Sequence, residues 1–414
     1  MRLRACMLAI AVVTPLRAFA QTPAAPPEAA PPAPPPAAPP PAAAPMAPPP
    51  AAAAAPAPAA PAAPTPKFTW GGLVDTYWMY NFIQADGNNS LVPPGGAGVV
   101  GRAFDTNANS ITLSYAKLSM NAAIDPVAFQ IDFGYGTTGT IINSTNTGVA
   151  FPAGVVGLTA APFAASFFLE QAFGTISLPG NLTFDFGKFV TTAGAEVIEA
   201  NKNWLYSRSL LFNIIPFVHT GARANLKIND KLTLQGSLVN GWNNDPDNNS
   251  WKTIGLSASI TATPMVSIIA TTYFDKEGNQ PVPTGGTTGD FRFLGDLVVA
   301  LTLSDKFGLN LNVDYIKAPD NFSSDYYLGA ALMGRYVISD RLNVAARGEY
   351  LENHFAPSGG ANIGQGEVTA MAGIDVGKNF ELRPELRIDF AGDPVFTNGK
   401  KEEFTGTLAA LTWF

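Results

Sequence analysis

The chain has 414 residues, of which 47% are hydrophobic and only 14% are charged, and its formal net charge at pH 7 is −7. This acidic balance argues against nucleic acid as a partner, because the phosphate backbone binds basic surfaces. Cys6 is the one cysteine, so the sequence excludes a disulfide framework and a cysteine-ligated metal site.

The first twenty residues have the features of a secretory signal peptide. Arg2 and Arg4 give a basic start, residues 5–16 form a short apolar core, and Ala18-Phe19-Ala20 is a small-residue cleavage site. Cleavage there removes Cys6 and three of the 25 basic residues, while all 32 acidic residues remain. We therefore expect a signal peptide at residues 1–20 and an exported, cysteine-free protein.

Residues 21–66 consist almost wholly of alanine and proline. Proline at this density is incompatible with helices and sheet ladders, and it favours extended polyproline II with a rise of roughly 3.1 Å per residue. We expect a periplasmic spacer here; a contact with a cell-wall polymer or a periplasmic partner is the alternative, and no residue supports it. Beyond the signal peptide, only this proline-broken segment has 18 or more apolar residues in a row, which excludes a transmembrane helix.

From Lys67 onward the sequence alternates between apolar and small or polar residues. In residues 68–82, Phe68, Trp70 and Val74 share one face and Asp75 falls on the other. Alternation of period two predicts strands, because successive side chains point to opposite faces. The pattern predicts strands at residues 68–82, 111–120, 127–135, 167–178, 182–187, 224–228, 232–238, 254–262, 265–275, 291–303, 307–315, 326–338, 342–350, 368–376, 380–390 and 404–414.

Short and long connections alternate along the whole chain. The short ones are residues 124–126, 179–181, 229–230, 263–264, 304–305, 339–340 and 378–379, and the long ones are residues 84–109, 137–165, 190–216, 243–251, 276–289, 318–325, 353–366 and 391–402. An up-and-down barrel in the bacterial outer membrane has short periplasmic turns, long external loops and an even strand number. We therefore predict an all-β transmembrane antiparallel barrel of about 16 strands at residues 67–414. A soluble secreted all-β protein is the alternative.

The alternation also sorts side chains between lipid and lumen. At residues 307–315, Phe307, Leu309 and Leu311 form the lipid face, while Asn312 and Asp314 point inward. A barrel of this width leaves a water-filled lumen, where charges select solutes by sign and size. The pore-lining candidates are Arg223, Lys227, Arg292, Asp314, Arg335, Arg347, Glu349, Arg383, Glu385 and Arg387. For any single residue, solvation of the lumen wall is the simpler interpretation.

Inward arginines recur on the tenth, twelfth, thirteenth and fifteenth predicted strands, which predicts a basic arc on one wall. The long loop at residues 190–216 carries the constriction candidates Glu196, Glu199, Lys202 and Arg208. If this loop enters the lumen opposite the arc, a constriction with a transverse field results. Its length fits an external flap equally well.

Residues 203–249 carry a resemblance to a known family. Ser207-Arg208-Ser209, the Pro-x-x-His-x-Gly segment from Pro216 to Gly221, and Asn240-Gly241-Trp242 resemble segments of the outer-membrane β-barrel porins of the OmpL-like type. The resemblance implies a channel for passive diffusion of small hydrophilic solutes or ions, without naming the solute. Homotrimers are common among porins of this size, so it also implies a homotrimer; it does not extend to the spacer.

An outer-membrane hydrolase is a less favoured alternative. A barrel hydrolase needs a nucleophile, a base and an orienting group near the outer rim. His219 and His354 are the only histidines, and no nucleophile pairs with either from spacing. We expect no enzymatic activity, no cofactor and no metal. A structural anchor or adhesin with a plugged lumen is the stronger alternative, because the long loops are compatible with binding.

Two details of the last strands lead to further expectations. Pro384 lies mid-strand on the outward face, where it removes a ladder hydrogen bond and predicts a β-bulge. The chain ends on Trp413 and Phe414, and only Phe414 has the outward parity. A terminal aromatic resembles the sorting signal of the barrel assembly machinery, so we expect this machinery and outer-membrane lipid as partners.

Overall fold

The computed structural model describes residues 66–83, 100–145, 166–247, 250–276, 291–317, 326–354, 363–396 and 399–414. The expected signal peptide and all of the expected spacer except Pro66 lie outside the described residues. So do large parts of several long loops.

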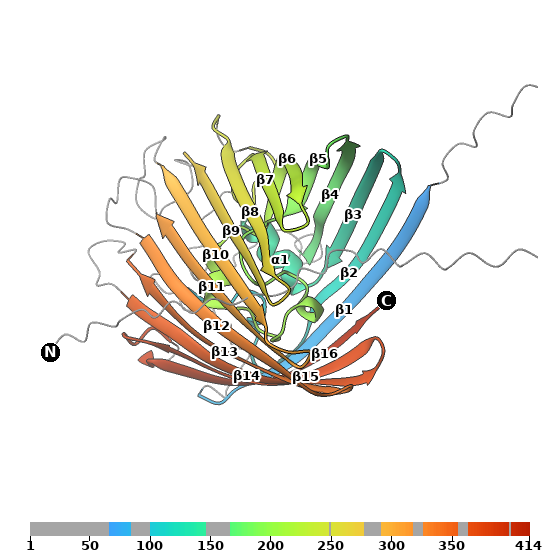
Figure 1. Cartoon of the computed structure of the whole chain (residues 1–414). Helices are drawn as coiled ribbons and strands as arrows, with labels where there is room; N and C mark the ends of the chain where they lie inside the picture. The colour runs from blue at the N-terminus through green and yellow to red at the C-terminus, as the bar shows by residue number, and fades with distance from the viewer. Residues whose placement is uncertain are drawn as a thin grey trace, which may run out of the picture. The chain divides into compact units, whose positions relative to one another are not determined.

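Sixteen antiparallel strands form one closed barrel, in which each strand pairs with its sequence neighbours and the last pairs with the first (Figure 1). The strands are β1 (Lys67–Asn81), β2 (Ser110–Ile124), β3 (Val127–Tyr135), β4 (Phe167–Leu178), β5 (Leu182–Val190), β6 (Val218–Asn229), β7 (Leu232–Val239), β8 (Thr253–Thr263), β9 (Val266–Asp275), β10 (Arg292–Thr302), β11 (Phe307–Lys317), β12 (Tyr326–Ser339), β13 (Leu342–Asn353), β14 (Ile363–Gly377), β15 (Phe380–Ala391) and β16 (Glu402–Trp413). The predicted fold class, strand number and strand order are confirmed.

Helices are short in the described part of the chain: α1 (Thr137–Thr145), the 3₁₀ turn η1 (Ala200–Lys202) and α3 (Leu210–Ile214). None of the helices in the described residues has the length and apolar character needed to cross a membrane.

The short connections join β2 to β3, β4 to β5 and each later pair up to β14 and β15, so they all lie at one end of the barrel. At the turn between β4 and β5, Gly180 and Asn181 both have positive φ, of 86° and 59°. Glycine and asparagine tolerate this left-handed geometry, and its twist matches that of the flanking strands. The sequence therefore specifies a tight turn there.

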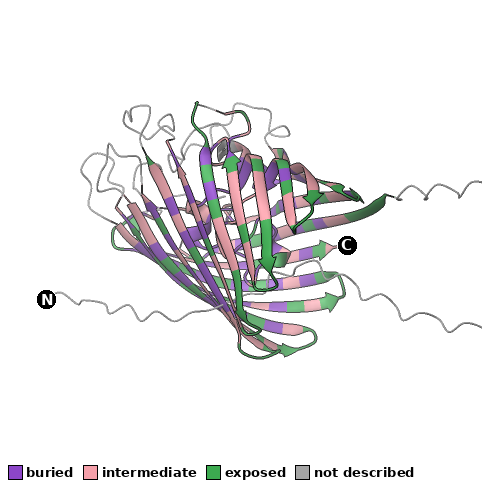
Figure 2. Ribbon diagram, turned by 45° about the horizontal axis from the view of Figure 1, so that its top comes forward, coloured by how far each residue is buried: buried purple, intermediate pink, exposed green. Residues whose placement is uncertain are grey.

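Buried and exposed residues alternate along many of the strands (Figure 2). On β1, Trp70 and Trp78 are 68% and 45% exposed on the outer face, whereas Asp75 is buried on the inner face. Large apolar residues dominate the outer face along the other strands as well. This is the distribution that a surrounding bilayer and a polar interior require.

The prediction of a β-bulge at Pro384 is wrong. β15 pairs with β16 in one continuous register through Pro384 and Leu408. On the other side, the ladder with β14 omits Arg383 and Pro384 and resumes at Leu382 and Ile374 without a shift. The missing N–H of proline therefore removes a hydrogen bond without inserting a residue. The register shift in this pair lies near the turn, between Asp375 and Gly377.

The barrel closes where the last residues meet β1. The backbone N–H of Phe414 donates to the Gly72 carbonyl at 3.1 Å, and the Gly72 N–H donates back at 3.2 Å. The Phe414 ring covers Gly72, where a side chain would collide with it. Trp413 packs against the apolar clusters of the interior, whereas Phe414 is 72% exposed.

Deletion of Phe414 should impair barrel assembly more than conduction. It removes two backbone hydrogen bonds at the closing seam, each worth about 1 kcal/mol, together with an exposed aromatic anchor. We expect a lower yield of folded barrel in heat-modifiable gel mobility after refolding, and an unchanged single-channel conductance for the molecules that fold. Phe414→Tyr is the matched control and should fold normally. An unchanged yield after deletion contradicts the prediction.

Candidate functional site

The third loop (residues 191–217), which joins β5 to β6, lies inside the barrel rather than over its outer rim. Its first part crosses from β9 toward β11. The hydroxyl groups of Thr192 and Tyr273 are 3.0 Å apart, and the Ala195 N–H donates to the Asn312 side chain at 3.0 Å. Tyr273 and Asn312 are inward residues of the wall, so the loop is bound to the lumen lining from its start.

Arg347 on β13 joins the third loop to the wall through an ion pair and hydrogen bonds. Its guanidinium donates to Glu196 and to the Ser207 carbonyl, both at 2.9 Å, and to Glu367 on the neighbouring β14. The Arg347 side chain is 0% exposed. A buried charge of this kind is stable only when it is paired and hydrogen-bonded. The loop provides a carboxylate and a carbonyl oxygen as acceptors for the guanidinium, in addition to Glu367 of the wall.

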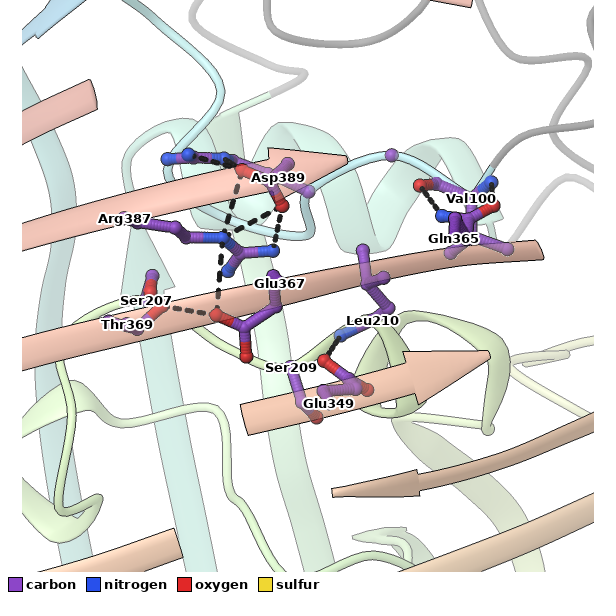
Figure 3. Close-up of polar contacts among 12 residues, drawn as sticks. Val100, Ser207, Ser209, Leu210, Glu349, Gln365, Glu367, Thr369, Arg387 and Asp389 are labelled. Atoms are coloured by element: carbon purple, nitrogen blue, oxygen red, sulfur yellow. Dashed lines mark hydrogen bonds and ion pairs between the residues drawn. The ribbon is translucent and has the colours of Figure 1, made fainter. Parts of the chain in front are cut away.

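The arginines of β15 bind backbone carbonyl groups of the same loop. Arg383 donates to the Ala200 carbonyl at 2.7 Å, and Arg387 donates to the Arg208 carbonyl at 2.7 Å. Each also pairs with a carboxylate on its own strand, Arg383 with Glu381 and Arg387 with Asp389. Figure 3 shows the pairing around Arg387. These guanidinium groups therefore hold the loop in a fixed position.

Inward carboxylates bind the N–H groups of the loop. Glu385 accepts from the backbone of Tyr206 at 2.8 Å and of Ser207 at 3.1 Å. Glu349 accepts from Leu210 and Leu211, both at 2.7 Å, at the start of α3 (Figure 3). The first N–H groups of a helix have no partner within the helix, and a carboxylate satisfies them.

Glu199 joins the loop to β2, three strands away from β15 around the barrel. Its carboxylate lies 2.7 Å from the ammonium groups of both Lys117 on β2 and Lys202 in the loop. Burial raises the pKa of the Glu199 carboxyl. The two ammonium groups together lower it by more than burial raises it, and the resulting pKa is about 2. Glu199 is therefore ionised at neutral pH. Lys202 itself remains largely exposed, with 60% of its side chain accessible.

A segment of the first loop (residues 100–109) also lies within the lumen, and the sequence pattern did not predict this position. Val100 exchanges two backbone hydrogen bonds with the Gln365 side chain, at 2.9 and 2.8 Å (Figure 3). Arg102 lies 2.6 Å from Asp389 and 2.9 Å from Asp105. The first-loop segment therefore shares Asp389 with Arg387, so both loops belong to one charge network.

Apolar side chains fill the space between the loops and the wall. Phe104 from the first-loop segment packs with Phe212 and Phe217 from the third loop, with tilted rings whose centroids are 5.2 to 5.8 Å apart. Arg208 lies over the Phe104 ring at 5.2 Å and donates to loop carbonyl groups. Leu211 packs in a second cluster with wall residues of β1, β12, β13 and β14. The loops thus form a packed plug within the lumen.

The expected gap between the basic arc and the third loop is absent from the described structure. Arg347, Arg383 and Arg387 contact the loop directly, instead of facing it across open water. The cost of desolvation explains why the loop contacts the arginines. Removing several neighbouring guanidinium groups from water is unfavourable unless each one donates to hydrogen-bond acceptors. Loop carbonyl groups and Glu196 provide them.

The remaining sequence-predicted residues are not gathered at the loop. Arg223 pairs with Asp185 on β5 at 2.7 Å, and Lys227 pairs with Asp230 in the next turn. Arg292 pairs with Asp275 and lies over the Trp242 ring, and Arg335 donates to the Asn343 side chain. Asp314 is buried opposite Asp296, and the Asn312 amide bridges both carboxylates.

The described residues contain no group of three or more His, Cys, Asp or Glu side chains placed to hold a metal ion. His219 is buried, with Nδ1 3.0 Å from the Gly241 carbonyl oxygen and its ring 4.7 Å from that of Tyr273. His354 stacks on Tyr326 at 4.0 Å. Both imidazoles thus have structural contacts.

Comparison with known proteins places this geometry among outer-membrane barrels. A family model described as "Putative beta-barrel porin-2, OmpL-like" matches residues 67–414. No curated protein matches the sequence.

Solved structures share the fold at low sequence identity. The trimer form of in-vitro folded OmpT from Vibrio cholerae has a TM-score of 0.52 and 13% identity, covering 84% of this chain and 99% of that one. The outer-membrane channel DcaP of Acinetobacter baumannii has a TM-score of 0.52 and 12% identity, covering 84% and 97%. An anion-selective porin from Comamonas acidovorans has a TM-score of 0.52 and 9% identity, covering 84% and 100%.

Replacing Arg347 should release the third loop. Arg347→Met leaves Glu196 and Glu367 without their buried partner, which costs about 3–5 kcal/mol for a buried pair. We expect a lower thermal unfolding temperature in detergent and a larger, noisier conductance in planar bilayers. Glu196→Gln should act in the same direction more weakly.

Arg341 in the exposed turn after β12 provides the control for the Arg347 experiment. Arg341→Met removes the same charge without touching the loop and should change neither quantity. If Arg347→Met behaves like Arg341→Met, the charge network does not hold the loop.

Proposed function

The chain belongs to the family of OmpL-like β-barrel porins, and we propose that its third loop narrows a channel for passive diffusion of small hydrophilic solutes or ions. It resides in the bacterial outer membrane. The observation that carries the proposal is a charged loop bound inside a closed sixteen-strand barrel. Such a barrel has room for water beside the loop, and the charges lining it discriminate among solutes.

We assign the predicted site residues, apart from the buried Asp314, to three groups. Arg347, Glu349, Arg383, Glu385 and Arg387 position the third loop, because their polar groups contact it. Arg223, Lys227, Arg292 and Arg335 belong to the lumen lining. Glu196, Glu199, Lys202 and Arg208 belong to the constricting loop itself.

A structural anchor with a plugged lumen is the second candidate function. The burial of Tyr77 and Met79, which point inward from β1, favours it, because loop atoms exclude water there. An enzyme is not proposed, since the histidines of the described residues have structural contacts and the family is one of channels.

Further proposals concern the export and assembly of the protein. We propose that residues 1–20 are cleaved as a signal peptide, that residues 21–66 form a periplasmic spacer, and that the β16 strand is read by the barrel assembly machinery. A homotrimer in outer-membrane lipid is supported by the trimer form of the structurally similar OmpT. Chemical cross-linking in native membranes tests it.

Purified protein should give ohmic, salt-dependent conductance in planar lipid bilayers. Current through a water-filled lumen scales with the concentration of mobile ions, whereas a plugged anchor inserts silently. Heat-modifiable gel mobility must first show that the protein is folded. Folded protein that inserts into vesicles but passes no current overturns the channel proposal and supports the anchor.

A further inference from the structure

The wall formed by β4 to β8 differs from the wall that holds the loop. Arg347, Arg383 and Arg387 have side chains that are at most 5% exposed, because the third loop covers them. On β4 to β8, by contrast, a run of inward hydroxyl and amide side chains remains partly exposed toward the short-turn end of the lumen. These residues are Thr175, Thr183, Asn225, Gln235, Ser257 and Ser259. The loops therefore leave this polar strip partly accessible in the described lumen.

Arg223 is the arginine within this strip, and its neighbours fix its orientation. Its Nε donates to Asp185 at 2.7 Å, and the guanidinium carbon lies 4.3 Å from the Phe189 ring centroid and 5.4 Å from that of Phe173. An arginine held by a carboxylate on one edge and by ring faces has little freedom to turn. The Nη2 group of the Arg223 guanidinium therefore keeps a constant orientation.

The Arg223 and Asp185 pair presents its positive end to the lumen. Asp185 accepts three hydrogen bonds, from Thr175 at 2.6 Å, from Asn225 at 3.2 Å and from Arg223 at 2.7 Å. Its side chain is 7% exposed, whereas that of Arg223 is 15% exposed. Among the described residues, Nη2 of Arg223 has no hydrogen-bond partner, so it is a free charged donor.

Lys227 continues the positive edge along the same inward face of β6. It lies four residues nearer the short-turn end, and its side chain is 54% exposed. Its partner Asp230 sits in the turn beyond the strand and is 96% exposed, so water screens that carboxylate. An ion moving along the strip meets Lys227 and then Arg223.

We infer that Arg223 is the solute-contacting charge of this channel, and that it binds the anionic group of permeating solutes through its free Nη2 edge. The open lumen then favours anions over cations. The inference rests on the proposed channel function and names the selectivity residue within it. It also implies that the arginines of β13 and β15 do not set the ion selectivity, because the third loop occupies their hydrogen-bond donors.

Reversal potentials in a KCl gradient across planar bilayers test the inference. Wild type should pass chloride in preference to potassium. Arg223→Gln should lower the chloride-to-potassium permeability ratio about five-fold, the equivalent of about 1 kcal/mol for unit charges about 4 Å apart in water. The shift should shrink between 0.1 and 1 M KCl, because salt screens a charge that faces water.

Two matched variants separate position from charge. Arg223→Lys keeps the charge but lacks the Nη2 donor, so it should lower the ratio, by less than Arg223→Gln does. Arg341→Gln removes one positive charge from an exposed turn outside the strip, and should leave the ratio unchanged. Heat-modifiable mobility confirms that each variant folds, and Arg223→Lys keeps the test valid should Arg223→Gln fold poorly.

Each outcome decides between the two proposals. Current without anion preference in wild type, or equal ratios in wild type and Arg223→Gln, overturns the assignment of Arg223 while the channel stands. Equal shifts in Arg223→Gln and Arg341→Gln also overturn it, since the effect is then one of net charge. Absence of current in folded wild type overturns the channel itself, and the inference with it.

Discussion

The requirement that every backbone polar group be hydrogen-bonded inside a bilayer determines this structure. Hydrocarbon offers no water to an unpaired N–H or C=O, so a sheet can span it only when closed. The pairing of β16 with β1, sealed by the bonds between Phe414 and Gly72, meets that requirement. Closure then gives every strand one face toward lipid and one toward the lumen, and the charged side chains go to the lumen.

Charges confined to the lumen create the second constraint. Arg347, Arg383 and Arg387 lie on β13 and β15 and would repel one another if left unpaired in a narrow space. Carboxylates on the same wall satisfy part of each guanidinium, and the third loop supplies carbonyl oxygens and Glu196 for the rest. The charges of the wall therefore position the loop, and the loop in turn fixes how much of the lumen stays open.

The sequence predicted the strands and their inward faces well, because period-two alternation is a local property. It missed the first five residues of β14, since Gly364 and Gly366 interrupt the pattern; the Phe390 ring covers Gly366 and leaves no room for a side chain. Glu367, a partner of Arg347, was missed for the same reason. The position of a loop in the lumen depends on contacts between residues that are far apart in the sequence. It therefore leaves only a weak signal in the sequence of the loop itself.

That signal is apolar composition within the loops. Residues 209–218 contain Leu210, Leu211, Phe212 and Phe217, which an external flap would expose to water. Phe104 in the first loop follows the same logic. Apolar residues in a long external loop thus indicate that it folds inward, although spacing alone cannot give the wall that it meets.

The two walls of the lumen cannot perform the same task. An arginine that binds loop carbonyl groups has its donors directed at protein, and releasing them to a solute costs the buried contacts that hold the loop. Arg223 escapes this conflict, because Asp185 and two phenylalanine rings hold it without the loop and leave Nη2 free. Loop anchoring and solute contact are therefore separated by position around the barrel, and the inward parity that both groups of arginines share could not distinguish them.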